Sequence, residues 1–263
     1  MQTNRPRLLP TEHGAWAFLF LPTVSALALR PSLAGLGLFI AGLAGFLGRV
    51  PLRRVVRGRL PSSFDQKWLL FYGLMGAAGL GLAMRGPRPD FLLALLPAVP
   101  LGAWLLWVDL KGGARSLAAE WTSIALPALL GTAMIRAGNG PWALAGALGV
   151  GSFLSLAAPV AYLRARLALR RGGKSSQSSQ SSQSSLGAAL LIHGVAGLIA
   201  LAMQLALGLR WLWPLWMGML LLRVLLEPKI ELGVPDAKAL GLRESLVCTI
   251  SAFALVLSLK RAM

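Results

Sequence analysis

Apolar stretches of membrane-spanning length follow one another along the whole chain, with short arginine-rich segments between them. A helix of ~20 apolar residues matches the hydrocarbon thickness of a bilayer. The apolar positions show no period of two, and lipid offers backbone groups no partners outside a helix or a closed barrel. The pattern predicts an all-α, polytopic transmembrane helix bundle of about nine spans. The predicted spans are 14–29, 32–48, 68–84, 90–108, 118–135, 141–163, 186–208, 211–226 and 244–259.

The lysines and arginines predict how these spans are oriented. If the N-terminus is cytosolic, 19 of the 26 lysines and arginines fall in cytosolic segments and seven in external ones. Because cytosolic loops carry the excess of basic residues, this split predicts an N-in, C-out topology. Of the nine acidic residues, only Asp90 would then be external. We therefore expect any chemistry at the cytosolic interface.

The first span has an alternative interpretation. Arg5 and Arg7, the apolar stretch after them and Ala26–Ala28 together resemble a signal peptide. Glu12 and His13 stand directly against the apolar stretch, which favours a span that is retained.

A polar segment separates the first six predicted spans from the last three. Between Lys174 and Ser185 the triplet Ser-Ser-Gln occurs three times in succession, without an apolar residue. Such a sequence has nothing to bury, so residues 172–186 are predicted to be a disordered cytosolic loop. A membrane bundle can pack across such a loop, and we predict a single transmembrane domain over residues 1–263.

Small residues recur at every fourth position in several spans, which lets helices approach closely in lipid. We expect this packing within one chain, with homodimerisation as the alternative. In the second and third spans the stripes are Gly37, Ala41 and Gly45, and Gly73, Ala77 and Gly81.

The composition limits the expected partners. The net charge of +17 is explained by basic loops attracted to anionic lipid headgroups, so membrane lipids are expected and nucleic acid is not. Two histidines, one cysteine and scattered carboxylates form no metal-binding motif, and neither a metal nor another cofactor is expected.

Five constellations of ionisable residues lie at the predicted cytosolic interface. Arg49 and Arg53 are spaced to share a helical face and to grip a phosphate or carboxylate, although topology anchoring is the simpler explanation. His193 lies inside a span, where an ionisable group usually has a partner; a structural hydrogen bond to a neighbouring helix is the alternative. Arg223 is placed to pair with Glu244. The candidate ligand-binding residues are Glu12, His13, Arg49, Arg53, Asp109, Arg115, Glu120, Arg164, His193, Arg223 and Glu244.

Three of these motifs resemble a known family. Glu12-His13-Gly14-Ala15-Trp16 after a proline resembles the opening of the YwiC-like bacterial membrane proteins. Tyr162-Leu163-Arg164 and Gly241-Leu242-Arg243-Glu244 resemble later elements of the same family. The resemblance implies a multi-pass protein of the cytoplasmic (inner) membrane and does not itself imply a reaction.

The predicted architecture is also similar to that of the UbiA-type prenyltransferases, which hold magnesium diphosphate through aspartate-rich loops after the second and sixth spans. The corresponding loops here carry mainly arginines, with Asp65 as the one carboxylate. Paired carboxylates bridge divalent ions and arginines do not, so magnesium-dependent prenyl transfer is not expected. The prediction is a cytosol-facing, arginine-lined pocket that binds an anionic amphiphile such as a lipid or isoprenoid. A lipid-modifying enzyme, a small-anion transporter and a membrane accessory or assembly protein are the competing hypotheses.

Overall fold

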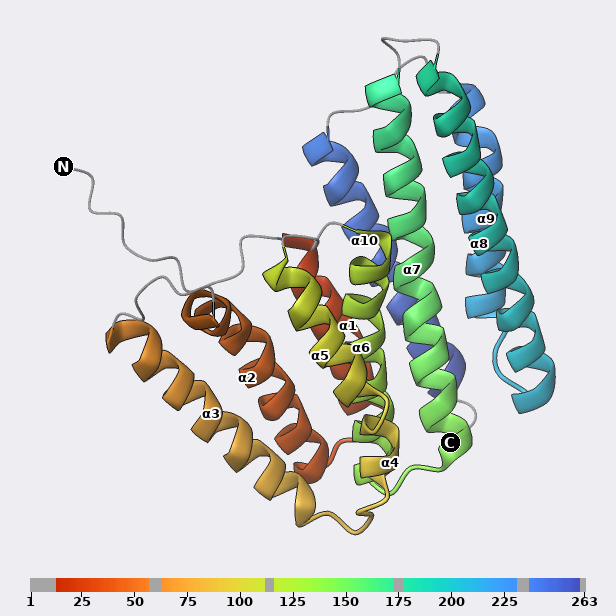
Figure 1. Ribbon diagram of the computed structural model, residues 1–263. Helices are drawn as coiled ribbons and strands as arrows, with labels where there is room; N and C mark the ends of the chain where they lie inside the picture. Colours follow the sequence, from red (N-terminus) through yellow and green to blue (C-terminus); the bar gives the residue numbers. More distant parts are fainter. Residues whose placement is uncertain (1–12, 57–62, 112–115, 173–176, 231–236, 261–263) are drawn as a thin grey trace. The chain divides into compact units, whose positions relative to one another are not determined.

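The computed structural model describes residues 13–56, 63–111, 116–172, 177–230 and 237–260, and within these ranges it is helical without strands. The all-α fold predicted from the apolar pattern is confirmed there. The helices, shown in Figure 1, are α1 (His13–Leu29), α2 (Leu33–Val56), α3 (Ser63–Met84), α4 (Phe91–Leu95), α5 (Ala98–Leu110), α6 (Leu117–Ala137), α7 (Trp142–Gly172), α8 (Gln177–Leu207), α9 (Leu212–Ile230) and α10 (Ala237–Leu259).

Seven segments of the described chain are helices long and apolar enough to cross a bilayer. Large apolar side chains such as Leu70, Leu205 and Leu246 are at least 60% exposed on them, as lipid-facing residues would be. These features are those of a multi-pass membrane protein. Each predicted span overlaps a helix, but α1 has only a shorter apolar stretch and α9 is not among the seven, so the count of nine stays a prediction. The seven are Leu33–Val56, Ser63–Met84, Phe91–Leu110, Leu117–Ala137, Trp142–Leu169, Leu186–Leu207 and Ala239–Leu259.

Two helices continue well beyond the apolar stretches that predicted them. α2 runs through the buried Pro51 to Val56, and α7 runs to Gly172. Arginine is a good helix former, so a helix already started in the apolar stretch extends into the basic segment at little cost. As a result Arg49, Arg53 and Arg164 lie on helices rather than in loops.

The Ser/Gln segment differs from its prediction. The sequence predicts a disordered loop over 172–186, whereas α8 begins at Gln177 and includes the serines and glutamines up to Ser185. Helix formation is unfavourable only for the first turn, which the apolar part of α8 supplies. Each further residue then adds one backbone hydrogen bond, so the helix extends into the serines and glutamines. Residues 173–176 lie outside the described part of the chain.

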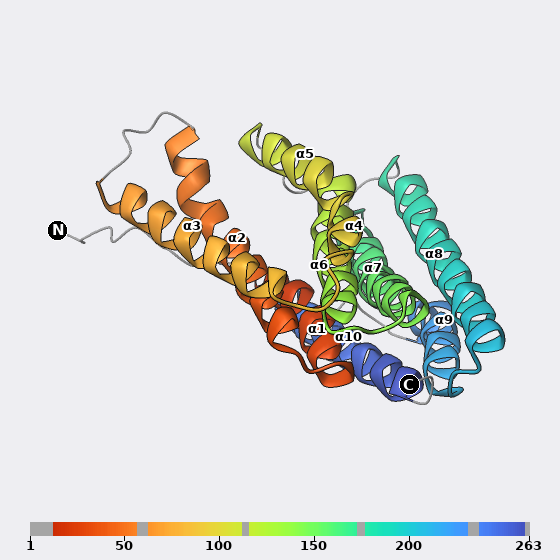
Figure 2. The ribbon, with the colours of Figure 1, turned by 90° about the horizontal axis from the view of Figure 1, so that it is seen from below.

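The chain forms two compact units, residues 1–145 and 146–263. In the first unit α2 and α3 lie side by side and antiparallel (Figures 1 and 2). Gly37 and Gly79 face each other where these helices meet: a Cβ built on Gly37 would lie 2.5 Å from the Gly79 carbonyl oxygen. The backbones can approach this closely because neither residue has a side chain.

The predicted stripes of small residues are thus only partly correct. Gly37 and Ala41 of α2 do line the contact with α3, but a Cβ on Gly45 would meet nothing within 4 Å. On α3 the predicted stripe is on the wrong face: Gly73 and Gly81 look into open space, and Gly79 makes the contact instead. Four-residue spacing occurs on both faces of this glycine-rich helix, so spacing alone does not select the packed one.

In the second unit α9 is tied to its neighbours by one buried tryptophan. The Trp213 side chain is fully buried, its indole Nε1 donates to Ser155 Oγ of α7 at 3.1 Å, and its backbone nitrogen donates to Ser258 Oγ of α10 at 3.0 Å. Gly151 of α7 lies against Leu255 of α10. These contacts fix the helices that carry the polar network described below.

Candidate functional site

The first polar cluster joins the end of α2 to the end of α5. Arg49 and Arg53 stand one helical turn apart and both bind Asp109: Arg49 Nε donates to Oδ2 at 3.0 Å and Arg53 Nη1 donates to Oδ1 at 3.3 Å. The Asp109 side chain is 1% exposed, whereas those of Arg49 and Arg53 are 31% and 42% exposed. The two arginines therefore share a face, as their spacing predicts.

This Arg49–Arg53–Asp109 cluster has spare binding capacity. A buried carboxylate requires close positive partners, and Asp109 holds both guanidinium groups in place. Each arginine uses one nitrogen for this contact, and within the described chain the remaining N–H groups of Arg49 and Arg53 have no recorded hydrogen-bond partner. The cluster presents two guanidinium groups against one carboxylate, with their unused edges partly exposed.

A neighbouring ion pair was not predicted from the sequence. Arg54 Nη1 donates to Asp65 Oδ1 at 2.9 Å and so joins the end of α2 to the first turn of α3. The sequence did contain a signal for this pair. The connection between the antiparallel helices α2 and α3 is short, so residues just before it, such as Arg54, and just after it, such as Asp65, come close together. Asp65 is thus a structural partner of α2.

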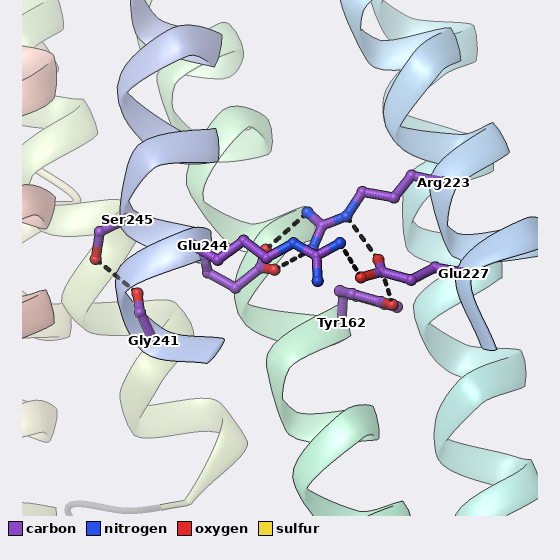
Figure 3. A network of polar contacts seen from close by, with 7 residues as sticks. Tyr162, Arg223, Glu227, Gly241, Glu244 and Ser245 are labelled. Carbon is purple, nitrogen blue, oxygen red and sulfur yellow. Dashed lines mark hydrogen bonds and ion pairs between the residues drawn. The ribbon is translucent and has the colours of Figure 1, made fainter. Parts of the chain in front are cut away.

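The second cluster lies in the other unit, around Arg223 of α9 (Figure 3). Arg223 Nε donates to Glu227 Oε2 at 2.7 Å, and its two terminal nitrogens bind both oxygens of Glu244 on α10. Glu227 is also paired with Arg243 and accepts from the Tyr162 hydroxyl of α7 at 2.7 Å. The Arg223 guanidinium lies 4.9 Å from the Tyr162 ring centroid.

The charges of this five-residue network balance. Two arginines face two glutamates, and Tyr162, Glu227 and Glu244 are all buried. Glu227 follows the predicted span 211–226. Burial opposes its ionisation, but the Tyr162 hydrogen bond and Arg223 outweigh that effect and hold the pKa of the Glu227 carboxyl below its usual range. The network is therefore balanced in charge and joins α7, α9 and α10.

The Arg223–Glu244 pair is present as predicted, but Tyr162, Glu227 and Arg243 were missed as members of the network. The spacing of Arg223 and Glu227, four residues apart on one helix, was the available signal. Tyr162 stands in a motif that the sequence singles out, but the motif does not indicate its partner, because that depends on how α7 is rotated about its axis.

His193 lies beside this network. Its side chain is 2% exposed, its Nδ1 lies 2.8 Å from the Ala189 carbonyl oxygen, and its ring meets that of Tyr162 edge-on with centroids 6.4 Å apart. The hydrogen bond goes to the preceding turn of its own helix, not to a neighbouring helix as the structural alternative had it. His193 therefore packs against the network through an aromatic contact.

The remaining predicted residues are placed as follows. Glu12 and Arg115 lie outside the described residues, and His13 begins α1. Ser116 caps α6 by accepting from the Ala119 nitrogen at 3.2 Å, and Glu120 stands in the first turn. Arg164 is half-buried on α7.

The predicted site residues thus separate into two groups. The structure brings Arg49, Arg53 and Asp109 together in the first unit, and Arg223 and Glu244 in the second, with His193 beside them. A single pocket formed by both groups stays a prediction. Among the described residues, no group of three histidine, cysteine or acidic side chains is placed to hold a metal ion.

Comparison with known proteins supports the resemblance found in the sequence. Residues 9–135 match the family model described as YwiC-like protein. This range contains Arg49, Arg53 and Asp109, whereas the network around Arg223 lies outside it. No curated protein and no solved structure matches the chain. The likeness to UbiA-type prenyltransferases accordingly stays a hypothesis.

Proposed function

We propose that this integral membrane protein binds the phosphate of an anionic amphiphile, a lipid or an isoprenoid, at the Arg49–Arg53–Asp109 cluster on the cytosolic side of the inner membrane. The observation that carries the proposal is the fixing of two partly exposed guanidinium groups by one buried carboxylate. Guanidinium groups bind phosphate oxygens through paired hydrogen bonds, and groups already held in position lose less entropy on binding.

The surroundings of the cluster suit an amphiphile better than a free ion. Arg49 and Arg53 stand near the end of α2, where an apolar helix meets a basic segment. α3 packs against α2 and exposes Leu70, Phe71 and Leu74, which are 65%, 53% and 62% exposed. A phosphate at the arginines would leave its acyl or isoprenyl chain beside such lipid-facing side chains.

Binding can be measured on the detergent-solubilised protein by native mass spectrometry, with phosphatidylglycerol and farnesyl phosphate as probes. We expect Arg49→Ala and Arg53→Ala each to weaken retention of at least one probe by roughly tenfold or more, because a hydrogen bond to a charged group contributes ~1.5–3 kcal/mol. Arg53→Lys should also weaken it, since lysine keeps the charge and loses the planar fork.

Lys67→Ala is the matched control. Lys67 is an exposed cation in α3, which packs against α2. It should leave retention unchanged. If Arg53→Lys binds both probes as tightly as the unmodified protein, the arginines act only as topology anchors and the proposal is wrong.

A further inference from the structure

A third arginine cluster lies at the opposite end of α2 from Arg49 and Arg53. There the turn Gly138–Gly140, which joins α6 to α7, is held by Arg30, Arg88 and Arg136 from three separate segments. Arg88 Nε donates to Asn139 Oδ1 at 2.8 Å, Arg30 Nη2 reaches the Asn139 carbonyl oxygen at 3.5 Å, and Arg136 Nη1 donates to the Gly140 carbonyl oxygen at 2.6 Å. We call these three arginines the turn cluster.

The backbone of the turn is shaped for this role. Asn139 has a φ of 63°, a left-handed conformation that asparagine tolerates better than most residues. A Cβ on Gly138 would lie 2.9 Å from Ser32 Oγ and 3.3 Å from Arg30 Cγ, so the missing side chain lets the turn pack directly against Arg30. The arginines are therefore gathered by the fold and not scattered along flexible loops.

The turn cluster is not neutralised by its surroundings. Asp90 pairs with Arg136 through one carboxylate oxygen. The Arg136 guanidinium carbon also lies 4.6 Å from the centroid of the Trp142 ring. Among the described residues, two buried donors at this end, Arg30 Nε and Arg136 Nε, have no hydrogen-bond partner, and neither does one acceptor, Asp90 Oδ1. The Arg136 side chain is only 7% exposed, so its unused donor is costly unless something binds there.

The predicted topology makes this gathering of arginines unexpected. With the N-terminus inside, only seven lysines and arginines are external, and four of them are Arg30, Arg85, Arg88 and Arg136. Insertion favours basic residues on the cytosolic side, so anchoring does not account for an external concentration.

We infer that the turn cluster is a second anion site, specific for a phosphate group, at the end of the first unit opposite to Arg49 and Arg53. The Arg30 contact with Asn139 is at the outer limit of a hydrogen bond, so its guanidinium can turn to a ligand at small cost. Arg88 is exposed and supplies the access. Arg136 is buried and is held in place by Asp90 and Trp142. The phosphate belongs either to a lipid headgroup or to a free ion.

The test uses the full chain carrying Arg53→Ala, which is expected to weaken binding at the first proposed site. Inorganic phosphate is titrated by calorimetry into detergent-solubilised protein, and binding of phosphatidic acid is measured in nanodiscs of phosphatidylcholine. We expect Arg30→Gln and Arg88→Gln each to weaken binding by roughly tenfold. Arg210→Gln removes an exposed arginine on the same predicted side but in the other unit, and should change nothing.

The outcomes separate the two sources of phosphate. Loss of inorganic phosphate binding identifies a free-ion site, and loss confined to phosphatidic acid identifies a headgroup site; either supports the inference. Phosphate-dependent protection of Arg30 and Arg88 against phenylglyoxal, read by peptide mass spectrometry, locates the site independently of any variant. The inference is overturned if neither probe binds, or if Arg30→Gln and Arg88→Gln behave like Arg210→Gln.

Discussion

At the scale of single residues, the chain handles buried charge in two ways. Around Arg223 every charge has an opposite partner, with two glutamates bound on two sides. At Arg49 and Arg53 two cations share one buried carboxylate. A network with balanced charges is typical of a structural contact, whereas an excess of partly exposed guanidinium groups favours the binding of an anion. This contrast is why we assign ligand binding to the first unit.

The structural role of the Arg223 network leads to a stability prediction. Glu244→Leu removes the α10 partner of Arg223 and leaves Arg223 and Arg243 to share Glu227, and breaking a buried ion pair in this way typically costs ~3–5 kcal/mol. Adding Arg223→Leu to that variant restores the balance, because Arg243 and Glu227 remain paired. The double variant should therefore unfold at a higher temperature in detergent than Glu244→Leu alone. If the double variant is the less stable of the two, the pairing does not stabilise the fold.

The same residues show how far a sequence predicts such a site. The pairing of Arg223 with Glu244 was predictable, because a charge within an apolar stretch requires a partner and few candidates exist. The binding of Asp109 by Arg49 and Arg53 was only half predictable: helical spacing indicated a shared face but not which carboxylate it meets. Tyr162 could not be assigned at all, since its hydroxyl reaches Glu227 only through the packing of α7 against α9.

At the scale of helices, the sequence predicts where they run better than which faces they pack. Each predicted span overlaps a helix, yet α2 continues past its apolar stretch through Pro51, and α3 packs through Gly79 instead of Gly73 and Gly81. The length of a membrane-spanning helix is set by the thickness of the bilayer, so it can be read from a single stretch of sequence. Packing depends on the mutual rotation of two helices, which no single helix encodes.

The α2–α3 contact leads to a prediction about these helices. Alanine is normally favoured over glycine in a helix by ~1 kcal/mol. Gly37→Ala should nevertheless destabilise the protein, because the new methyl group would lie 2.5 Å from a backbone oxygen that cannot rotate away, and overpacking costs ~1–3 kcal/mol. Gly79→Ala should behave likewise, with a contact of 2.6 Å to the Gly37 oxygen.

The matched controls are Gly45→Ala and Gly81→Ala on the same two helices, where an added Cβ meets nothing within 4 Å. Both should leave the thermal unfolding temperature in detergent unchanged or slightly raised. Equal destabilisation at all four glycines would show that helix propensity or lipid contact, and not the close approach of α2 and α3, determines the effect.

At the scale of the whole molecule, the two proposed anion sites depend on membrane topology. They lie at opposite ends of α2, since Arg53 stands near its end and Arg30 just before its start. The uneven split of lysines and arginines predicts that the Arg53 end faces the cytosol. In this orientation the two proposed phosphate sites would face opposite leaflets of the membrane.

The topology can be tested by labelling single cysteines with a membrane-impermeant maleimide in intact cells. Cys248 is the sole cysteine and is buried, so Cys248→Ser provides a clean background. We expect Arg85→Cys and Arg210→Cys to be labelled from outside, and Lys111→Cys and Ser181→Cys to be labelled only after the cells are opened. The C-terminal Met263→Cys should be labelled from outside, because nine spans reverse the side of the chain. If Met263→Cys and Ser181→Cys were labelled from the same side, an even number of spans would lie between them, which contradicts the nine-span topology. If Arg85→Cys and Lys111→Cys were labelled from the same side, α4 and α5 would not cross the membrane.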